Sequence, residues 1–217
     1  MVLQVIFTIL ITRQANKNER GYLSTLVMKK NIVWIIGLLF QFPLFAQEDT
    51  LAKRKAHEDS IVQRIVLIAD AGQLTNGKHP VVDAVRNFIT LDKKTTILYL
   101  GDNLYKDGLP DDQQTIYNAS RAILDTQLSV ARGTPAKVVM IPGNHDWENG
   151  GRGGYDAIIR QQLYVDFLRI PNVKYFPEDG CPGPVEISLG NDVTVIVFDI
   201  HWWLHPFDKP EIKSDCA

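Results

Sequence analysis

The sequence has no run of Lys or Arg residues and no excess of positive charge. Its 23 Lys and Arg residues are outnumbered by 25 Asp and Glu residues, and the formal net charge is −2. Because proteins bind nucleic acids through basic patches that contact phosphate groups, we do not expect nucleic acid as a partner. Phosphate chemistry in this protein would therefore need metal ions to supply the positive charge.

The sequence also has no internal repeat, no low-complexity tract and no second domain boundary. Of its 217 residues, 45% are hydrophobic and 22% are charged. This composition is ordinary for a globular protein and excludes a disordered or fibrous chain. The length fits one domain with a sizeable hydrophobic core.

The N-terminal part has an apolar run that is too short for a good membrane-spanning helix. A basic start at Met28 is followed by the apolar residues 32–45 and by Ala46. This pattern predicts a signal peptide over residues 28–46, and an uncleaved anchor is the alternative. No Cys follows the run, which argues against a lipid anchor. We expect residues 1–27 to be a start-site extension.

Export follows from that signal peptide. The expected location is periplasmic or extracellular, with association with the cell envelope as an open alternative, and without a stable membrane span after cleavage. Residues 47–63 are predicted to form a polar, partly helical linker. Residues 64–217 are predicted to form the folded domain.

Within that domain, short apolar runs alternate with amphipathic stretches. The β-branched runs predict strands that are buried on both faces, and the stretches between them have helical spacing. The predicted strands are residues 64–69, 95–100, 137–141, 173–176, 185–189 and 193–198, and the predicted helices are residues 80–91, 112–131 and 155–169. Alternating strands and helices predict an α/β fold with right-handed crossovers and a largely parallel sheet.

Polar side chains follow the first three strands at their carboxyl ends. These residues are Asp70, Asp102, Tyr105, Asn144, His145 and Asp146. Because the carboxyl ends of parallel strands meet at one edge of a sheet, we expect the six side chains to lie close together. Two neighbouring carboxylates would repel each other, and hard or borderline cations relieve that repulsion. One carboxylate could bridge two metal ions.

Each of these motifs has a structural alternative when it is taken alone. A single Asp at a strand end is more often a helix cap or a turn residue than a ligand. The run from Gly143 to Asp146 is more specific, because four polar or special residues after an apolar strand have no structural need. The three motifs in order favour a functional site.

The three motifs resemble those of the calcineurin-like metallophosphoesterase superfamily, which are Asp-x-His, Gly-Asp and Gly-Asn-His-Asp/Glu. The first motif departs from this pattern, because Gly72 stands where the family has a metal-binding His. Purple acid phosphatases show the same departure together with a Tyr in Gly-Asp-x-x-Tyr, and Tyr105 has that position. The sequence is therefore similar to the purple acid phosphatase-like branch, from about residue 64 onwards.

The resemblance implies an α/β/β/α sandwich and a pair of metal ions. Asp70 and Tyr105 would bind the first ion, Asp102 would bridge, and Asn144 would bind the second. A phenolate ligand favours Fe(III) at the first position, and the second ion would be Fe, Zn or Mn.

The resemblance also implies catalytic roles for two residues that would not bind metal. His145 would lie near the phosphate, where it would stabilise charge or protonate the leaving oxygen. Asp146 would orient His145 from outside the set of metal ligands.

The resemblance ends at the histidines that the family supplies later in its sequence. The five histidines of this chain are His57, His79, His145, His201 and His205, and none lies in a Gly-His-x-His motif. We therefore expect a sandwich that is incomplete at its C-terminus. Such a chain would bind metals weakly and hydrolyse little by itself.

Two features near the C-terminus leave alternatives open. Trp202 and Trp203 would form a wall of the substrate site or pack between sheet and loop. Cys181 and Cys216 are the only cysteines, and an even count in an oxidising compartment favours a disulfide between them.

The function expected from these features is metal-dependent hydrolysis of phosphate esters by a two-metal centre with a metal-bound hydroxide as nucleophile. The substrate would be a small phosphate ester or a phosphoprotein. A nucleotidase or pyrophosphatase would share the metals but needs a base-binding domain. The alternative outside enzymes is a degenerate metal-binding or accessory module of a longer envelope protein.

Overall fold

The computed structural model describes residues 6–12, 53 and 55–216. The predicted signal peptide and most of the predicted start-site extension lie outside these residues. The chain divides into two compact units. One consists of residues 11–62, and the other consists of residues 1–10 and 63–217. In the unit of residues 11–62, residues 53 and 55–60 are helical. Strand β2 (Ile61–Ile68) then begins inside the range that the sequence analysis assigned to the linker.

The main sheet has the strand order β1-β2-β3-β4-β5, in which β1 is Ile6–Thr12. Strands β2, β3 (Thr95–Leu100), β4 (Lys137–Ile141) and β5 (Val173–Tyr175) pair in parallel. Their chain order equals their spatial order, as a series of right-handed crossovers in one direction produces. The first five residues of β3 are buried without alternation, because elements cover both faces of this strand. These strands confirm the predicted α/β fold class.

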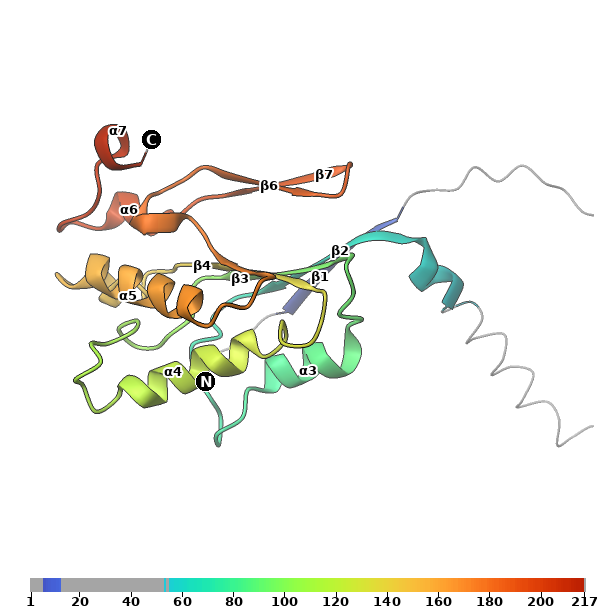
Figure 1. Ribbon diagram of the computed structural model, residues 1–217, viewed down its shortest axis with the longest axis horizontal. Helices are drawn as coiled ribbons and strands as arrows, with labels where there is room; N and C mark the ends of the chain where they lie inside the picture. Colours follow the sequence, from blue (N-terminus) through green and yellow to red (C-terminus); the bar gives the residue numbers. More distant parts are fainter. Residues whose placement is uncertain (1–5, 13–52, 54, 217) are drawn as a thin grey trace, which may run out of the picture. The chain divides into compact units, whose positions relative to one another are not determined.

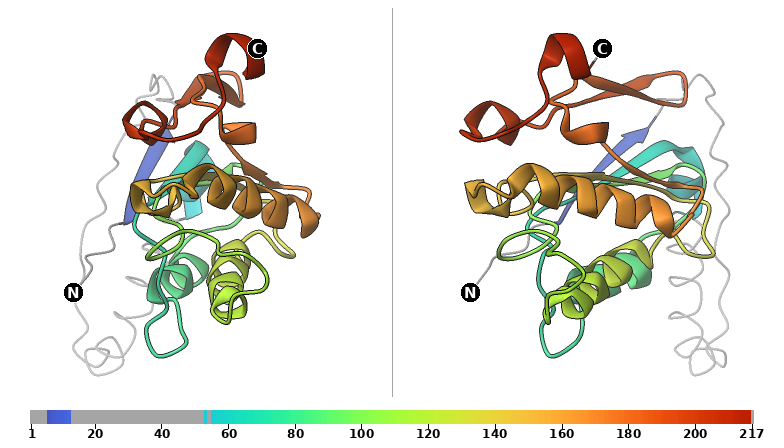
Figure 2. Two further views of the ribbon diagram at one scale, coloured as in Figure 1. Left: turned by 90° about the vertical axis from the view of Figure 1, so that its left-hand side faces the viewer. Right: turned by 60° about the vertical axis from the view of Figure 1, so that its left-hand side comes forward.

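Helices α3 (Pro80–Phe88) and α4 (Tyr117–Leu128) lie next to each other on one face of the main sheet (Figures 1 and 2). Helix α3 begins with Pro80, and it buries Val81, Val82 and Val85 against the sheet. Both helices are shorter than predicted. Residues 112–116 belong to the loop before α4, and Phe88 at the end of α3 is exposed rather than on the buried face.

Helix α5 (Gly154–Phe167) connects β4 to β5 and contacts β5. Two short 3₁₀ segments flank it, η2 (Glu148–Gly150) and η3 (Glu178–Gly180). Only Trp147 separates η2 from the Gly-Asn-His-Asp motif. The chain between β4 and α5 therefore lies close to the predicted site.

The hairpin of β6 (Val185–Leu189) and β7 (Val193–Val197) forms a second, antiparallel sheet. It lies over the face of the main sheet opposite α3 and α4 (Figure 1). The described domain thus has a helix layer, the main sheet and a two-stranded sheet, followed by the short helices α6 (His201–Leu204) and α7 (Ile212–Asp215). Within the described residues, no helix has the length and apolar character to span a membrane.

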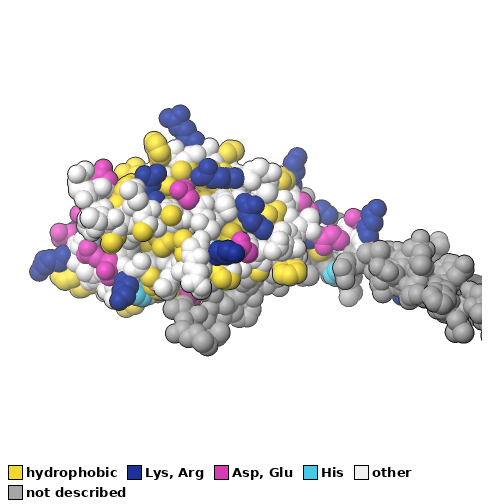
Figure 3. All heavy atoms as spheres, turned by 90° about the horizontal axis from the view of Figure 1, so that it is seen from below, with side chains coloured by type: hydrophobic (Ala, Val, Ile, Leu, Met, Phe, Trp, Pro, Cys, Tyr) yellow, Lys and Arg dark blue, Asp and Glu magenta, His cyan; other side chains and the backbone are white. Residues whose placement is uncertain are grey.

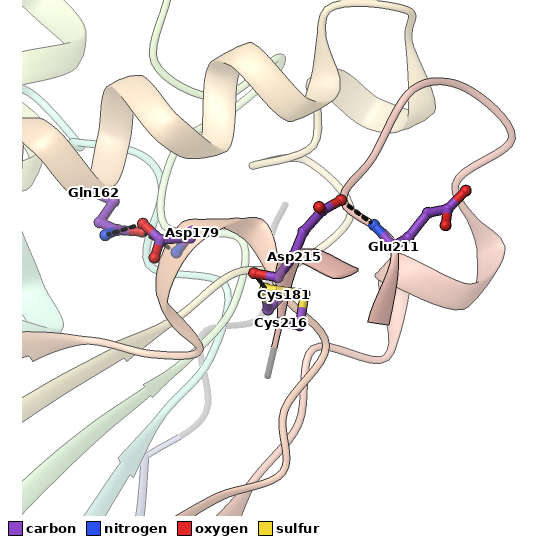
Figure 4. The surroundings of a disulfide bond; sticks show 6 residues. All are labelled: Gln162, Asp179, Cys181, Glu211, Asp215 and Cys216. Atoms are coloured by element: carbon purple, nitrogen blue, oxygen red, sulfur yellow. Dashed lines mark hydrogen bonds between the residues drawn. A yellow bond between two sulfur atoms is a disulfide. The ribbon is translucent and has the colours of Figure 1, made fainter. Parts of the chain in front are cut away.

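A disulfide joins Cys181 and Cys216, with 5.7 Å between the Cα atoms. It connects the stretch before β6 to the segment just after α7 (Figure 4). The backbone N–H of Glu211 donates to the Asp215 carboxylate over 2.8 Å, which steadies the last helical turn beside the bridge. This is the cysteine pair that the sequence analysis expected.

The face formed by α3 and α4 carries charges of both signs. Lys and Arg side chains are spread over this face, with Asp and Glu side chains between them (Figure 3). A mixed distribution of this kind does not create the single-sign field that attracts a polyanion.

Candidate metal centre

The loops after β2 and β3 are in direct backbone contact. The N–H of Asp70 donates to the carbonyl of Gly101 over 3.2 Å, and the N–H of Tyr105 donates to the carbonyl of Gly72 over 3.0 Å. A Cβ atom at Gly72 would lie 2.6 Å from the Tyr105 nitrogen and 2.7 Å from the Asp102 oxygen. Position 72 therefore accepts only glycine without a shift of backbone. The close approach of the two loops leaves no room for a side chain at this position.

Three oxygen-bearing side chains converge where these two loops meet. The Tyr105 hydroxyl donates a 2.7 Å hydrogen bond to the Asp70 carboxylate and lies 3.5 Å from the Asp102 carboxylate. Asp70 and Asp102 have φ angles of 57° and 53°, in the left-handed region that non-glycine residues rarely adopt. The two strained backbones aim both carboxylates at one phenol.

Burial is the main cause that raises the pKa of Tyr105 above its ordinary value, and its hydrogen bond to Asp70 acts in the same direction. The neutral form of the Tyr105 phenol is favoured, because its hydroxyl donates a hydrogen bond to the negatively charged carboxylate of Asp70. Replacing that proton by a cation would keep all three oxygens as ligands. Oxygen donors of this kind suit hard metal cations.

The loop after β4 packs against Asp102. The backbone N–H of His145 donates to the Asp102 carboxylate over 3.2 Å. A Cβ atom at Gly143 would lie 2.5 Å from the Asp102 nitrogen. Asn144 lies on the same loop with its side chain exposed, and its amide nitrogen donates to Oδ1 of Asn149 over 3.1 Å. The structure thus brings Asp70, Asp102 and Tyr105 together and places Asn144 on the adjoining loop.

The imidazole of His145 lies beside this cluster. Its Nδ1 is 2.5 Å from the carbonyl oxygen of Lys106, and its ring meets the Tyr105 ring edge-on at 4.7 Å between centroids. Because a carbonyl oxygen only accepts hydrogen bonds, Nδ1 carries the hydrogen. The other ring nitrogen, Nε2, is then the atom available to a substrate.

Asp146 is fully buried, and its carboxylate ties the β3 loop to the β4 loop. It accepts hydrogen bonds from the backbone N–H groups of Gly143, Asn103 and Leu104 over 2.8–3.1 Å. Burial raises the pKa of Asp146 to about 7, against the effect of these hydrogen bonds. Its bonds hold the loops, whereas the His145 ring has its hydrogen bond with Lys106. The orienting role expected for Asp146 stays a prediction.

Comparison with known proteins identifies the family to which the chain belongs. A family model described as calcineurin-like phosphoesterase matches residues 63–201, which is more than half of the chain. The chain belongs to the calcineurin-like phosphoesterase family. No curated protein and no solved structure matched the chain.

Membership of the calcineurin-like phosphoesterases indicates metal-dependent hydrolysis of phosphoesters, and members generally bind two divalent metal ions. The matched range contains every site residue named above. Within the part of the chain that the structure describes, no three His, Cys, Asp or Glu residues are grouped to hold a metal ion. The donors that fit a metal here are the two carboxylates, the phenol of Tyr105 and the amide of Asn144.

Two buried residues hold the site of this calcineurin-like phosphoesterase from the helix side, and the sequence analysis missed one of them, Gln127. Gln127 of α4 is fully buried, and its amide nitrogen donates to the carbonyls of Ala71 and Asn103 over 2.7 and 2.8 Å. His79 contacts the same Ala71 carbonyl over 2.8 Å through Nε2 and caps α3 through Nδ1. The sequence signal that could have identified Gln127 is its position on the same side of α4 as the buried residues Leu124 and Leu128.

Asp199 is the second residue that the sequence analysis missed. The buried Trp147 donates from its indole nitrogen to Asp199 over 2.7 Å, and the backbone N–H of His201 donates to the other carboxylate oxygen over 3.0 Å. Asp199 thereby connects the chain after Asp146 with the chain after β7. Trp202 packs partly buried against the core, whereas Trp203 is half exposed.

Proposed function

We propose that this protein hydrolyses phosphate esters with a two-metal centre of the purple acid phosphatase type. The observation that carries the proposal is the Tyr105 phenol between two carboxylates, at 2.7 Å from Asp70 and 3.5 Å from Asp102. A calcineurin-like phosphoesterase with His at position 72 would not need this phenol. Gly72 and Tyr105 touch through their backbones, so the two departures from the family pattern belong to one arrangement.

Four residues would hold the metals. Asp70 and Tyr105 would bind the first ion, for which a phenolate favours Fe(III), and Asp102 would bridge the two ions. Asn144 would bind the second ion, proposed as Fe, Zn or Mn. Two such ions supply positive charge to the phosphate and make a water molecule more acidic.

The remaining chemistry falls to His145. Its Nδ1 donates to the Lys106 carbonyl, which leaves Nε2 free of this bond and defines the tautomer of the neutral ring. A protonated Nε2 would donate to a phosphate oxygen or transfer its proton to the leaving oxygen. The proposed substrates are small phosphate esters or phosphoproteins, met after export across the cytoplasmic membrane.

A second candidate function is that of a metal-binding or accessory module with little turnover. The observation in its favour is that the described residues hold no group of three His, Cys, Asp or Glu around the site. Two metals would then have few protein ligands, and binding would be weak.

The test is phosphatase activity and metal content of the 217-residue chain and of a version extended through the next open reading frame. A chromogenic phosphate monoester is assayed with Fe, Zn or Mn present, for the wild type, Asp102→Asn and the surface control Asp112→Asn. Turnover and bound metal that are lost only in Asp102→Asn support the phosphatase. Metal binding without turnover supports the accessory module. Neither metal nor turnover in the wild type contradicts both functions.

A further inference from the structure

The side-chain amide of Asn144 has a specific partner. Asn144 lies in the turn after β4, and its Nδ2 donates to Oδ1 of Asn149 over 3.1 Å. Asn149 lies five residues further on, in the middle of η2. Both side chains are exposed, so neither core packing nor burial sets the orientation of the Asn144 amide.

The orientation of this amide decides whether it can bind a metal ion. An amide binds a cation through its oxygen, and a half-turn of the group would present the NH₂ instead, which only donates. An acceptor placed at the nitrogen selects one of these two orientations. With Nδ2 held by Asn149, Oδ1 of Asn144 is the atom that remains for a metal ion.

The chain around Asn149 is itself held in place. Asn149 and Glu148 have φ angles of 50° and 52°, a backbone conformation that most side chains disfavour. The Glu148 carboxylate accepts a hydrogen bond from the N–H of Gly153 over 2.7 Å, and the N–H of Gly150 donates to the carbonyl of Trp147 over 2.9 Å. Several contacts thus maintain a strained turn whose side chain faces Asn144.

We propose that Asn149 is a positioning residue for the second metal, because its side-chain oxygen fixes the amide of Asn144 with the oxygen outwards. This inference rests on the proposed two-metal function and goes beyond it. Asn149 does not touch metal or substrate in this role. It acts through Asn144 alone.

Two substitutions separate the side-chain acceptor from the backbone. Asn149→Gly removes the acceptor and tolerates the φ angle of 50°. Asn149→Asp keeps an oxygen at the same position. Asn76→Gly is the matched control, because Asn76 is also exposed, has a φ of 52°, and lies in a different loop.

The first measurement is the affinity for Mn²⁺, by equilibrium dialysis of the full chain, with Asn144→Ala as the reference for a lost ligand. We expect Asn149→Gly to bind Mn²⁺ about 10- to 100-fold more weakly, the range typical of residues that orient a ligand. Asn149→Asp and Asn76→Gly should bind as the wild type does or more tightly. Wild-type affinity in Asn149→Gly, or equal losses in Asn149→Gly and Asn149→Asp, would overturn the proposal.

The second measurement needs no metal. Nitrogen-15 relaxation of the Asn144 side-chain amide should show a loss of order in Asn149→Gly, with order retained in Asn149→Asp and in Asn76→Gly. An unchanged amide in Asn149→Gly would overturn the proposal. If the wild type and Asn144→Ala bind Mn²⁺ equally, the two-metal function fails, and the relaxation data still decide whether Asn149 orients Asn144.

Discussion

At the scale of single residues, three positions of the candidate centre have roles that their motifs alone do not indicate: positions 72, 105 and 146. Position 72 has no side chain, and the phenol of Tyr105 lies between the carboxylates of Asp70 and Asp102. Asp146 is a carboxylate in a cluster of carboxylates, yet it is fully buried and bonded to backbone N–H groups. Its task is to hold the loops at a fixed spacing.

The Tyr105→Phe variant tests the phenolate. With Fe(III) bound, the wild type should show a visible charge-transfer band, and Tyr105→Phe should lose it because no phenolate oxygen remains. Tyr117→Phe, a tyrosine at the start of α4, serves as the control and should keep the band. An unchanged visible spectrum in Tyr105→Phe would refute the ligand assignment.

The Gly72→Ala variant tests the close approach of the two loops. The added Cβ meets backbone atoms at 2.6–2.9 Å, which cannot move as a flexible side chain would. We expect a loss of about 1–3 kcal/mol in the free energy of unfolding. Gly133→Ala is the comparison, because its Cβ meets open space at a φ of 72° and costs only about 1 kcal/mol of backbone strain. Urea unfolding of both variants measures the difference.

At the scale of elements, the site is a meeting of loops that helices and a hairpin hold from outside. Helix α4 reaches the first two loops through Gln127. The chain after β7 reaches the third loop through Asp199, which accepts from Trp147. The elements therefore determine the spacing of the site without contributing a ligand to it.

The Asp199 link predicts a dependence of stability on pH. Burial raises the pKa of Asp199 from 3.8 to about 6, so the folded state holds this proton more tightly than the unfolded state does. Its stabilising contribution is full below pH 3.8 and is lost as the pH rises through about 6.

The measurement for Asp199 is the free energy of unfolding between pH 4 and 7, compared with Asp199→Asn. Asparagine does not titrate, so the difference between the two proteins should change by about 3 kcal/mol across this range. The variant also loses hydrogen bonds, but this cost does not vary with pH. A constant difference between wild type and Asp199→Asn would contradict the raised pKa.

At the scale of the whole molecule, the described chain has one main sheet with helices on one face and a hairpin over the other. The hairpin has only two strands, and such a unit is marginal by itself. The Cys181–Cys216 disulfide joins the segment before the hairpin to the end of α7. The bridge closes the chain over β6, β7 and the Trp-Trp segment.

Removal of this disulfide should weaken the hairpin side and leave the main sheet intact. The bridge spans 35 residues, and the loss of such a closed loop costs about 3–4 kcal/mol. The double variant Cys181→Ser and Cys216→Ser should therefore unfold at lower urea concentration, with helix content preserved before the transition. Reduction of the wild type should give the same midpoint. A midpoint that equals that of the oxidised wild type would exclude a stabilising bridge.

Much of the fold was predictable, because strands and helices leave patterns of apolar residues over short stretches of the sequence. The run 95–100 is apolar, β-branched and bounded by turn residues, and the structure confirms it as β3 without a shift. The ends of helices were less predictable. Residues 112–116 have helical spacing but lie in the loop before α4.

The sequence by itself determined the fold class and the residues at the strand ends, since strand runs and the motifs that follow them are contiguous in the chain. Only the tertiary structure decided how these residues are used. Gln127 contacts Ala71 across 56 residues, and Trp147 contacts Asp199 across 52. No local pattern encodes such pairs, because their partners are chosen by the packing of whole elements.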